Sequence, residues 1–222
     1  MKIYKSIFIL LVNFFVLISC DKDDEAQPLP PAPTLRDFAV QYNTDILKIE
    51  TFLKTHSISV TNHAGFSDDQ DVSYATVPSL DENSIWGSNP SEPKASLLTK
   101  TVSIKDVVHK IYYIKFRPGI GASPTLTNQI KTQYTGFLIE DGYVFEDSVD
   151  EGVNFPLSNL ITGWREILPE FKMGTITGVN QYSDFGAGVM FLPSALAYYN
   201  TSTQHFPSYS PLGFSFKLYN VF

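Results

Sequence analysis

The sequence predicts an α+β protein built on an antiparallel sheet. Residues 130–139 alternate between two faces, the period of a β-strand, and Asp141-Gly142 then supplies the composition of a tight hairpin turn. Residues 107–116 are rich in β-branched and aromatic side chains, and residues 212–219 alternate again. Apolar residues over 38–53 instead recur at helical spacing. Strands joined by tight turns, together with isolated helices, favour this class.

The N-terminal residues have the pattern of a secretory signal peptide. Two lysines precede an apolar run over residues 7–18, which is shorter than the roughly 20 residues that span a membrane. The run ends beside Cys20, the only cysteine, and the small residue before it resembles the bacterial lipobox. We expect residues 1–19 to be a signal peptide and Cys20 to be lipidated, which would hold the mature chain on a membrane surface. An ordinary unpaired thiol is the alternative.

Residues 20–33 have the composition of a tether. Asp21-Lys22-Asp23-Asp24-Glu25 follows the cysteine, and residues 27–33 are proline-rich and should be extended. The acidic residues are either a solvated spacer or similar to a signal that sends lipoproteins to the surface of some Gram-negative bacteria, and both interpretations stay open. The net charge of −7 argues against nucleic acid as a partner, because phosphate binding needs a basic face.

Residues 34–103 are predicted to hold an amphipathic helix followed by an irregular connector. The helix should be capped by Thr34 with Asp37 and should pack on the domain or, alternatively, serve as a partner site. Its apolar stripe consists of Phe38, Tyr42, Ile46, Ile49 and Leu53. A short strand is expected around residues 58–60, and residues 61–103 show little periodicity.

Residues 104–222 are predicted to form the main domain. The strand over 107–116 ends at Arg117-Pro118-Gly119, and residues 164–173 have helical spacing that Pro169 should end or kink. The alternation over 212–219 predicts a strand with one face in the core.

Several blocks of this domain, in order, resemble the FKBP-type peptidyl-prolyl cis-trans isomerases. They are Tyr134-Thr135-Gly136, Phe145-Glu146-Asp147-Ser148, Ile161-Thr162-Gly163-Trp164, Phe171-Lys172-Met173-Gly174, the run from Leu192 to Tyr198, and the run from Ser210 to Leu218. The resemblance implies an FKBP-like fold, in which a highly curved antiparallel sheet wraps around a short helix. It also implies an inserted loop or bulge within residues 174–190.

The resemblance further implies a prolyl isomerase that binds the twisted X-Pro amide in an aromatic pocket, with no cofactor and no metal. Trp164 would be the floor under the proline ring, while the Ile161 amide and the Tyr198 hydroxyl would donate hydrogen bonds. The implied catalytic residues are Tyr134, Phe145, Glu146, Ile161, Trp164 and Tyr198. The implied substrate-binding residues are Phe155, Leu160, Phe206 and Phe214. Taken singly, each aromatic residue also fits ordinary core packing.

Three departures from the family pattern leave a second function open. Glu146 replaces an aspartate, Glu151 stands where an arginine is usual, and Tyr199 stands where a glycine is usual. Activity could therefore be low, and the alternative is a non-catalytic binding or holdase module. The expected partners are proline-containing exported polypeptides and the macrolide ligands of the family. The expected location is the bacterial cell envelope, lipid-anchored on the periplasmic or surface face of the outer membrane.

Overall fold

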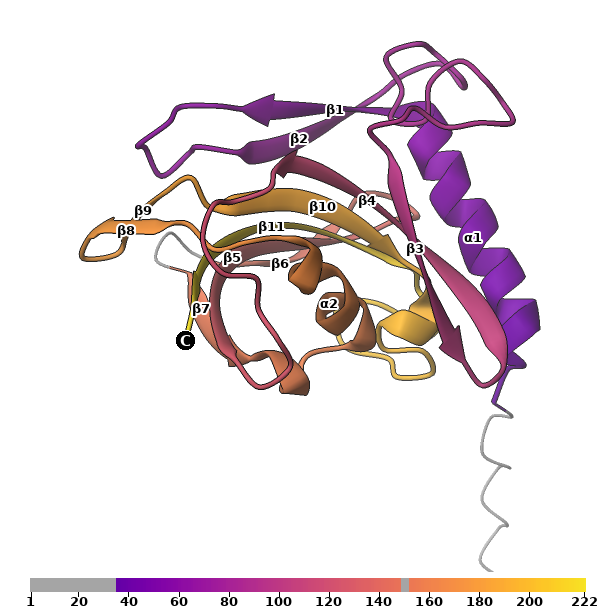
Figure 1. Ribbon diagram of the computed structural model, residues 1–222. Helices are drawn as coiled ribbons and strands as arrows, with labels where there is room; N and C mark the ends of the chain where they lie inside the picture. The colour runs from indigo at the N-terminus through magenta and orange to yellow at the C-terminus, as the bar shows by residue number, and fades with distance from the viewer. Residues whose placement is uncertain (1–34, 149–151) are drawn as a thin grey trace, which may run out of the picture. The chain divides into compact units, whose positions relative to one another are not determined.

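A seven-stranded antiparallel sheet is the centre of the structure, a computed structural model that describes residues 35–148 and 152–222 (Figure 1). The strand order is β3-β4-β10-β11-β5-β6, and β7 pairs with β5 as well. The final strand lies between β10 and β5, so the C-terminal residues complete the sheet. The strands are β3 (Leu98–Ile104), β4 (Val107–Arg117), β5 (Gln129–Leu138), β6 (Val144–Asp147), β7 (Val153–Pro156), β10 (Gly186–Leu192) and β11 (Leu212–Val221).

The predicted hairpin is present as β5 and β6, and the predicted strands over 107–116 and 212–219 are confirmed as β4 and β11. Gly142 has φ +74°, which suits the turn between β5 and β6. Beyond the turn, Ser148 fixes the end of β6. Its side-chain Oγ accepts from the Tyr134 N–H at 2.7 Å, and its own N–H donates to the Tyr134 carbonyl at 2.9 Å.

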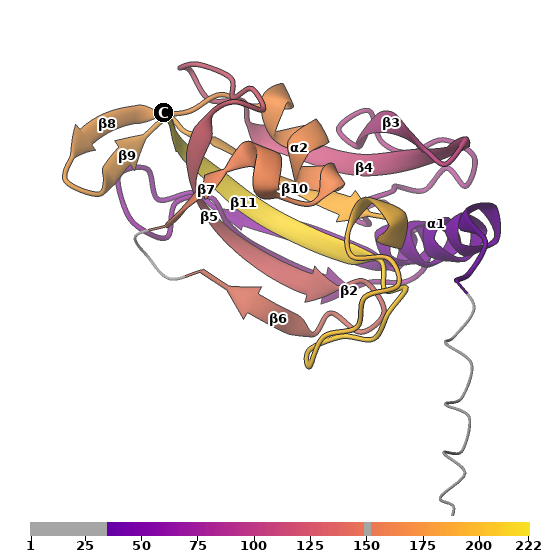
Figure 2. The ribbon, with the colours of Figure 1, turned by 90° about the horizontal axis from the view of Figure 1, so that it is seen from below.

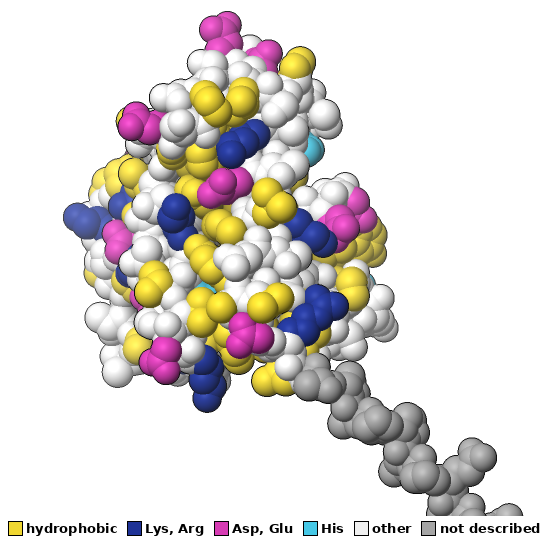
Figure 3. Space-filling model, turned by 90° about the vertical axis from the view of Figure 1, so that its right-hand side faces the viewer, with side chains coloured by type: hydrophobic (Ala, Val, Ile, Leu, Met, Phe, Trp, Pro, Cys, Tyr) yellow, Lys and Arg dark blue, Asp and Glu magenta, His cyan; other side chains and the backbone are white. Residues whose placement is uncertain are grey.

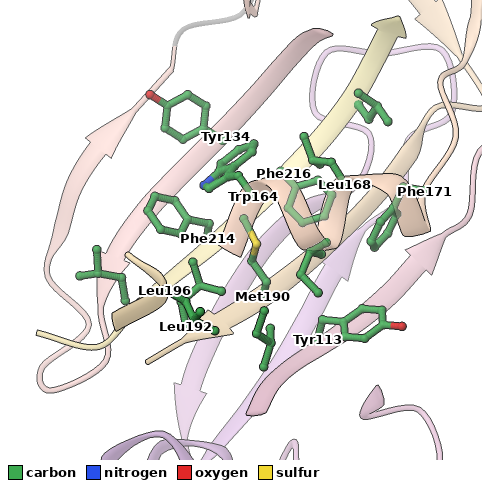
Figure 4. Close-up of a cluster of buried hydrophobic side chains, with 14 of the residues drawn as sticks. Tyr113, Tyr134, Trp164, Leu168, Phe171, Met190, Leu192, Leu196, Phe214 and Phe216 are labelled. Atoms are coloured by element: carbon green, nitrogen blue, oxygen red, sulfur yellow. The ribbon is translucent and has the colours of Figure 1, made fainter. Parts of the chain in front are cut away.

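One face of the sheet is covered by a short helix, α2 (Thr162–Ile167), as predicted (Figure 2). A 3₁₀ turn, η2 (Leu168–Glu170), ends the helix at Pro169, because proline lacks the N–H that would continue the ladder. The helix and the segment after it pack into a cluster of buried side chains on this face (Figure 4). That cluster includes Tyr113, Trp164, Leu168, Phe171, Met190, Phe214 and Phe216.

The predicted core face of residues 212–219 is confirmed, because Leu212, Phe214, Phe216 and Leu218 lie in the cluster on the α2 side. The opposite face of the sheet is buried as well, which the sequence did not predict. Successive residues of β4 alternate between the two cores, with Tyr113 on the α2 side and Tyr112 on the other. Lys217 of β11 is buried and donates to Asp71 at 2.5 Å. The cover comes from the N-terminal part of the described chain: α1 (Phe38–Thr55), the hairpin β1 (His56–Thr61) and β2 (Asp71–Thr76), and residues 77–97 (Figure 1).

The helix α1 begins one turn later than predicted. Asp37 is its N-cap and accepts from the N–H groups of Ala39 at 2.9 Å and Val40 at 3.0 Å, while Thr34 lies outside the described residues. Its buried face holds Gln41, Asp45, Ile49, Phe52 and Leu53, so the predicted stripe is correct only toward the C-terminal end. On the side of the molecule where α1 lies, acidic and basic side chains are interspersed with hydrophobic ones (Figure 3).

Two segments predicted to be irregular contain strands. The connector over 61–103 includes β2 and most of β3, and the predicted boundary between 103 and 104 falls inside β3, which pairs with β4. The insertion over 174–190 contains the hairpin of β8 (Thr175–Gly178) and β9 (Gln181–Ser183), followed by β10. β2 and β8 are short and mostly exposed, and β9 has only three residues, so their sequences lack a strong apolar period.

The predicted signal peptide, Cys20 and the tether lie outside the described residues. No helix in the described part of the chain is long and apolar enough to cross a membrane.

Candidate active site

A cavity of about 300 Å³ opens beside the N-terminal end of α2. It brings together eight of the ten site residues that the sequence implied, from four strands, one helix and two loops. The cavity is lined by Tyr134, Glu146, Phe155, Asn159, Leu160, Ile161, Trp164, Tyr198 and Phe214. The volume is at the small end for ligand sites and suits a single side chain such as a proline ring.

Trp164 forms one wall of this cavity and is held rigidly by its neighbours. Its indole is only 4% exposed and meets the ring of Tyr134 at 5.3 Å and the ring of Phe214 at 5.5 Å, both in edge-to-face geometry (Figure 4). Residues 160–161 link the 3₁₀ turn η1 (Leu157–Asn159) to α2, which places Trp164 in the first turn of the helix. The indole is thus packed from behind but open on the cavity side.

Phe145 and Phe206 are the two implied residues that do not line the cavity. They form a layer behind it: the Phe145 ring lies 4.9 Å from Phe206 and 5.8 Å from Phe214, and Phe206 lies 5.3 Å from Tyr198. Gly136 makes room for this layer, because a Cβ there would lie 2.6 Å from the Phe145 ring. These two aromatic residues therefore support the cavity wall through Phe214 and Tyr198.

The polar groups of the cavity centre on Glu146. Its Oε1 accepts a hydrogen bond from the Tyr134 hydroxyl at 2.5 Å. The glutamate side chain, which is longer than the aspartate it replaces, therefore still reaches into the cavity. Burial, the bond to Glu146 and the nearby negative charge raise the pKa of Tyr134. Burial and the charge of Glu146 likewise raise the pKa of Tyr198. Both hydroxyls therefore stay protonated at and above neutral pH.

Two hydrogen-bond donors in the cavity wall are free. Within residues 35–148 and 152–222, neither the Ile161 N–H nor the Tyr198 hydroxyl has a hydrogen-bond acceptor. Tyr198 is 38% exposed, so it lies at the rim of the cavity. A carbonyl group of a bound polypeptide could accept from each of them without displacing an internal bond.

The three departures from the family pattern have different outcomes. Glu146 lies in the cavity, Glu151 lies outside the described residues, and Tyr199 has φ +47°, a conformation that glycine adopts readily and tyrosine rarely. Sequence reasoning missed Asn159, a cavity residue in η1 whose only signal is its place two residues before Ile161. The described residues contain no group of three or more His, Cys, Asp or Glu side chains that could hold a metal.

Comparison with known proteins now identifies the class. Residues 121–219 match the family model of the FKBP-type peptidyl-prolyl cis-trans isomerases. The chain is 31% identical over 85 residues to FK506-binding protein 1 of Gibberella zeae, covering 35% of this chain and 77% of that relative. This protein belongs to the FKBP-type peptidyl-prolyl cis-trans isomerase family.

Bacterial members of the family match over a longer stretch. The FKBP-type peptidyl-prolyl cis-trans isomerase FkpA of Aeromonas hydrophila is 30% identical over 152 residues, covering 68% of this chain and 52% of that relative. This chain therefore spans about half the length of that relative. A crystal structure of FkpA from Escherichia coli is 28% identical, covering 55% of this chain and 51% of that chain with a TM-score of 0.45.

Proposed function

We propose that this protein catalyses the cis-trans isomerisation of X-Pro bonds in polypeptides. The observation that carries the proposal is the aromatic cavity beside Trp164, with the free donors of Ile161 and Tyr198 at its wall. In this proposal Trp164 is the floor under the proline ring, and Phe155, Leu160 and Phe214 are its apolar walls. Phe145 and Phe206 support those walls from behind.

The physical basis is the polarity of the amide during rotation. Rotation about the X-Pro bond meets a barrier of about 18–20 kcal/mol because the planar form is stabilised by resonance. The twisted form has lost much of that resonance and is less polar. An apolar cavity therefore binds the twisted form more strongly than the planar one. This difference in binding lowers the barrier to rotation. Hydrogen bonds from the Ile161 N–H and the Tyr198 hydroxyl to flanking carbonyls would hold the chain on either side of the rotating bond.

The Tyr134–Glu146 pair gives the cavity a fixed polar edge. Because the Tyr134 hydroxyl donates to Glu146, the carboxylate stays oriented along the cavity wall rather than free in solvent. In the proposed reaction the Tyr134 hydroxyl keeps its proton, which agrees with the raised pKa of Tyr134.

The test is the relaxation of a proline-containing peptide of the Ala-Phe-Pro type from its cis to its trans form. We expect the full chain to accelerate relaxation at micromolar concentration and Trp164→Phe, which keeps an aromatic ring in the fold, to do so less well. Absence of any acceleration by the parent chain, with the fold verified by circular dichroism, would remove the enzymatic proposal. Suppression of client aggregation by that same inactive parent would instead support a binding module.

We further propose that the protein acts on exported polypeptides at the bacterial cell envelope, held there by acyl chains on Cys20. The support is the sequence: an apolar run with two preceding lysines ends beside the only cysteine. We also propose that the macrolide ligands of the family occupy the cavity. Cys20→Ser should release the protein from the membrane fraction, and a macrolide should inhibit peptide relaxation; a membrane-bound Cys20→Ser chain would contradict the anchor.

A further inference from the structure

The N-terminal half of α1 holds the loop that carries Tyr198. We call residues 193–211, between β10 and β11, the Tyr198 loop. Asp45 is 1% exposed, and its Oδ2 accepts from the N–H of Ser194 at 2.8 Å and from the Ser194 hydroxyl at 2.6 Å. Gln41 donates to the other oxygen, Oδ1, at 2.6 Å. Both carboxylate oxygens of Asp45, and both the N–H and the hydroxyl of Ser194, are hydrogen-bonded in this buried contact. The start of the Tyr198 loop is therefore fixed to α1.

The same helix end holds the loop at two further points. The ring of Tyr199 stacks on Phe38, with centroids 4.2 Å apart and an angle of 15° between the rings, and its hydroxyl donates to the Arg36 carbonyl. Tyr209 lies under the Arg36 guanidinium at 4.3 Å, and its carbonyl accepts from the Gln41 amide at 3.3 Å. Ser194, Tyr199 and Tyr209 of the Tyr198 loop therefore all contact residues 36–45.

These contacts hold Tyr199 in a backbone conformation with a positive φ. A φ of +47° is unfavourable for a non-glycine residue, and the ring stacking and hydroxyl bond of Tyr199 offset that cost. Tyr198, the preceding residue, lies in the cavity wall, and its hydroxyl has no acceptor within the described residues. The direction in which Tyr198 points is thus set by the residue after it, which α1 holds.

We propose that Asp45 and Tyr199 are positioning residues, through which α1 keeps the Tyr198 hydroxyl where it can donate to a bound polypeptide. This inference rests on the proposed isomerase function. Asp45 on α1 lies outside residues 121–219, which match the family model, whereas Ser194 and Tyr199 lie inside them, so the contact joins the N-terminal segment to the matched domain. Asp45 and Ser194 are 149 positions apart in the sequence, so the contact exists only in the folded chain.

The test compares matched variants of the full chain. Asp45→Asn keeps the shape but turns an amide NH₂ toward the Gln41 NH₂, and Tyr199→Gly removes the stacked ring while accepting the same φ. The double variant Gln41→Glu/Asp45→Asn restores a hydrogen bond between these two side chains, now donated by residue 45 and accepted by residue 41, but it removes the Gln41 donor to the Tyr209 carbonyl. Ile49→Val is the control, because Ile49 is buried on the same helix but packs in the core on the second face of the sheet.

We expect Asp45→Asn and Tyr199→Gly to lower kcat by about twofold to tenfold, and by no more than Tyr198→Phe does, with little change in KM. The double variant should recover part of the loss, because residues 41 and 45 are paired again while the Tyr209 carbonyl has lost its donor. In a Tyr198→Phe background, Asp45→Asn should cost no further activity, because the group it positions is gone. Ile49→Val should lower the unfolding temperature and leave kcat unchanged.

Amide hydrogen exchange gives a readout that does not depend on catalysis. The loop amides of Ser194, Tyr199 and Tyr209 are hydrogen-bonded and should exchange faster in Asp45→Asn than in Ile49→Val. If the parent chain proves inactive, the proposed function fails while this measurement still decides whether α1 orders the loop. Equal exchange in the two variants, or an Asp45→Asn loss that persists in full in the Tyr198→Phe background, would overturn the inference.

Discussion

Removal of the Tyr198 hydroxyl tests the proposed site with little disturbance of the fold. The hydroxyl makes no hydrogen bond within the described residues, and the ring is 38% exposed. Tyr198→Phe should therefore leave the unfolding temperature within about 2 °C of the parent, since no buried partner loses a bond. The ring itself stays packed against Phe206 at 5.3 Å.

The expected effect on catalysis follows from one lost hydrogen bond. A neutral bond contributes about 0.5–1.5 kcal/mol, and if it forms with the substrate during rotation, kcat/KM should fall by about twofold to tenfold. The assay is peptide relaxation at several substrate concentrations, with thermal unfolding followed in parallel. Tyr143→Phe is the matched control, because Tyr143 is 51% exposed at the hairpin turn and lies outside the cavity.

Two results would refute this reasoning. An unchanged kcat/KM in Tyr198→Phe would mean that the hydroxyl does not contact the rotating substrate. A comparable loss in Tyr143→Phe would mean that the assay reports some general property of the surface rather than the cavity.

Three further predictions concern pH and packing. Because the pKa values of Tyr134 and Tyr198 are raised, kcat/KM should stay level from about pH 7 to about pH 10; a fall with its midpoint below pH 10 would contradict this. Gly136→Ala should lower the free energy of unfolding, measured in urea, by about 1–3 kcal/mol, because its Cβ would overlap the Phe145 ring; an unchanged value would show that the ring shifts freely. Burial lowers the pKa of His109, whose Nε2 has no hydrogen-bond partner among the described residues, so the unfolded chain binds the proton better and stability should be lost as pH falls through 6.5. His109→Gln should weaken this loss when urea unfolding is compared at about pH 8 and about pH 5, and equal losses in both chains would contradict the assignment.

The features that the sequence predicted well are set by local chemistry. The hairpin of β5 and β6 follows from alternation and an Asp-Gly step, and the end of α2 follows from Pro169. The ordered blocks that resemble the family predicted the FKBP-like fold, and they named eight residues that the structure gathers around one cavity. Asn159 was missed because a single polar residue in a short turn has no periodic or compositional signal.

What the sequence alone determined is therefore the family, the main strands and the aromatic composition of the site. Only the tertiary structure decided that the sheet has two buried faces, that β2, β3, β8 and β9 form in segments with little periodicity, and that Gln41 and Asp45 belong to the buried side of α1. The physical reason is distance along the chain. A buried carboxylate such as Asp45 is stable only beside donors from Ser194 and Gln41, and short strands form only against partners that the rest of the fold supplies.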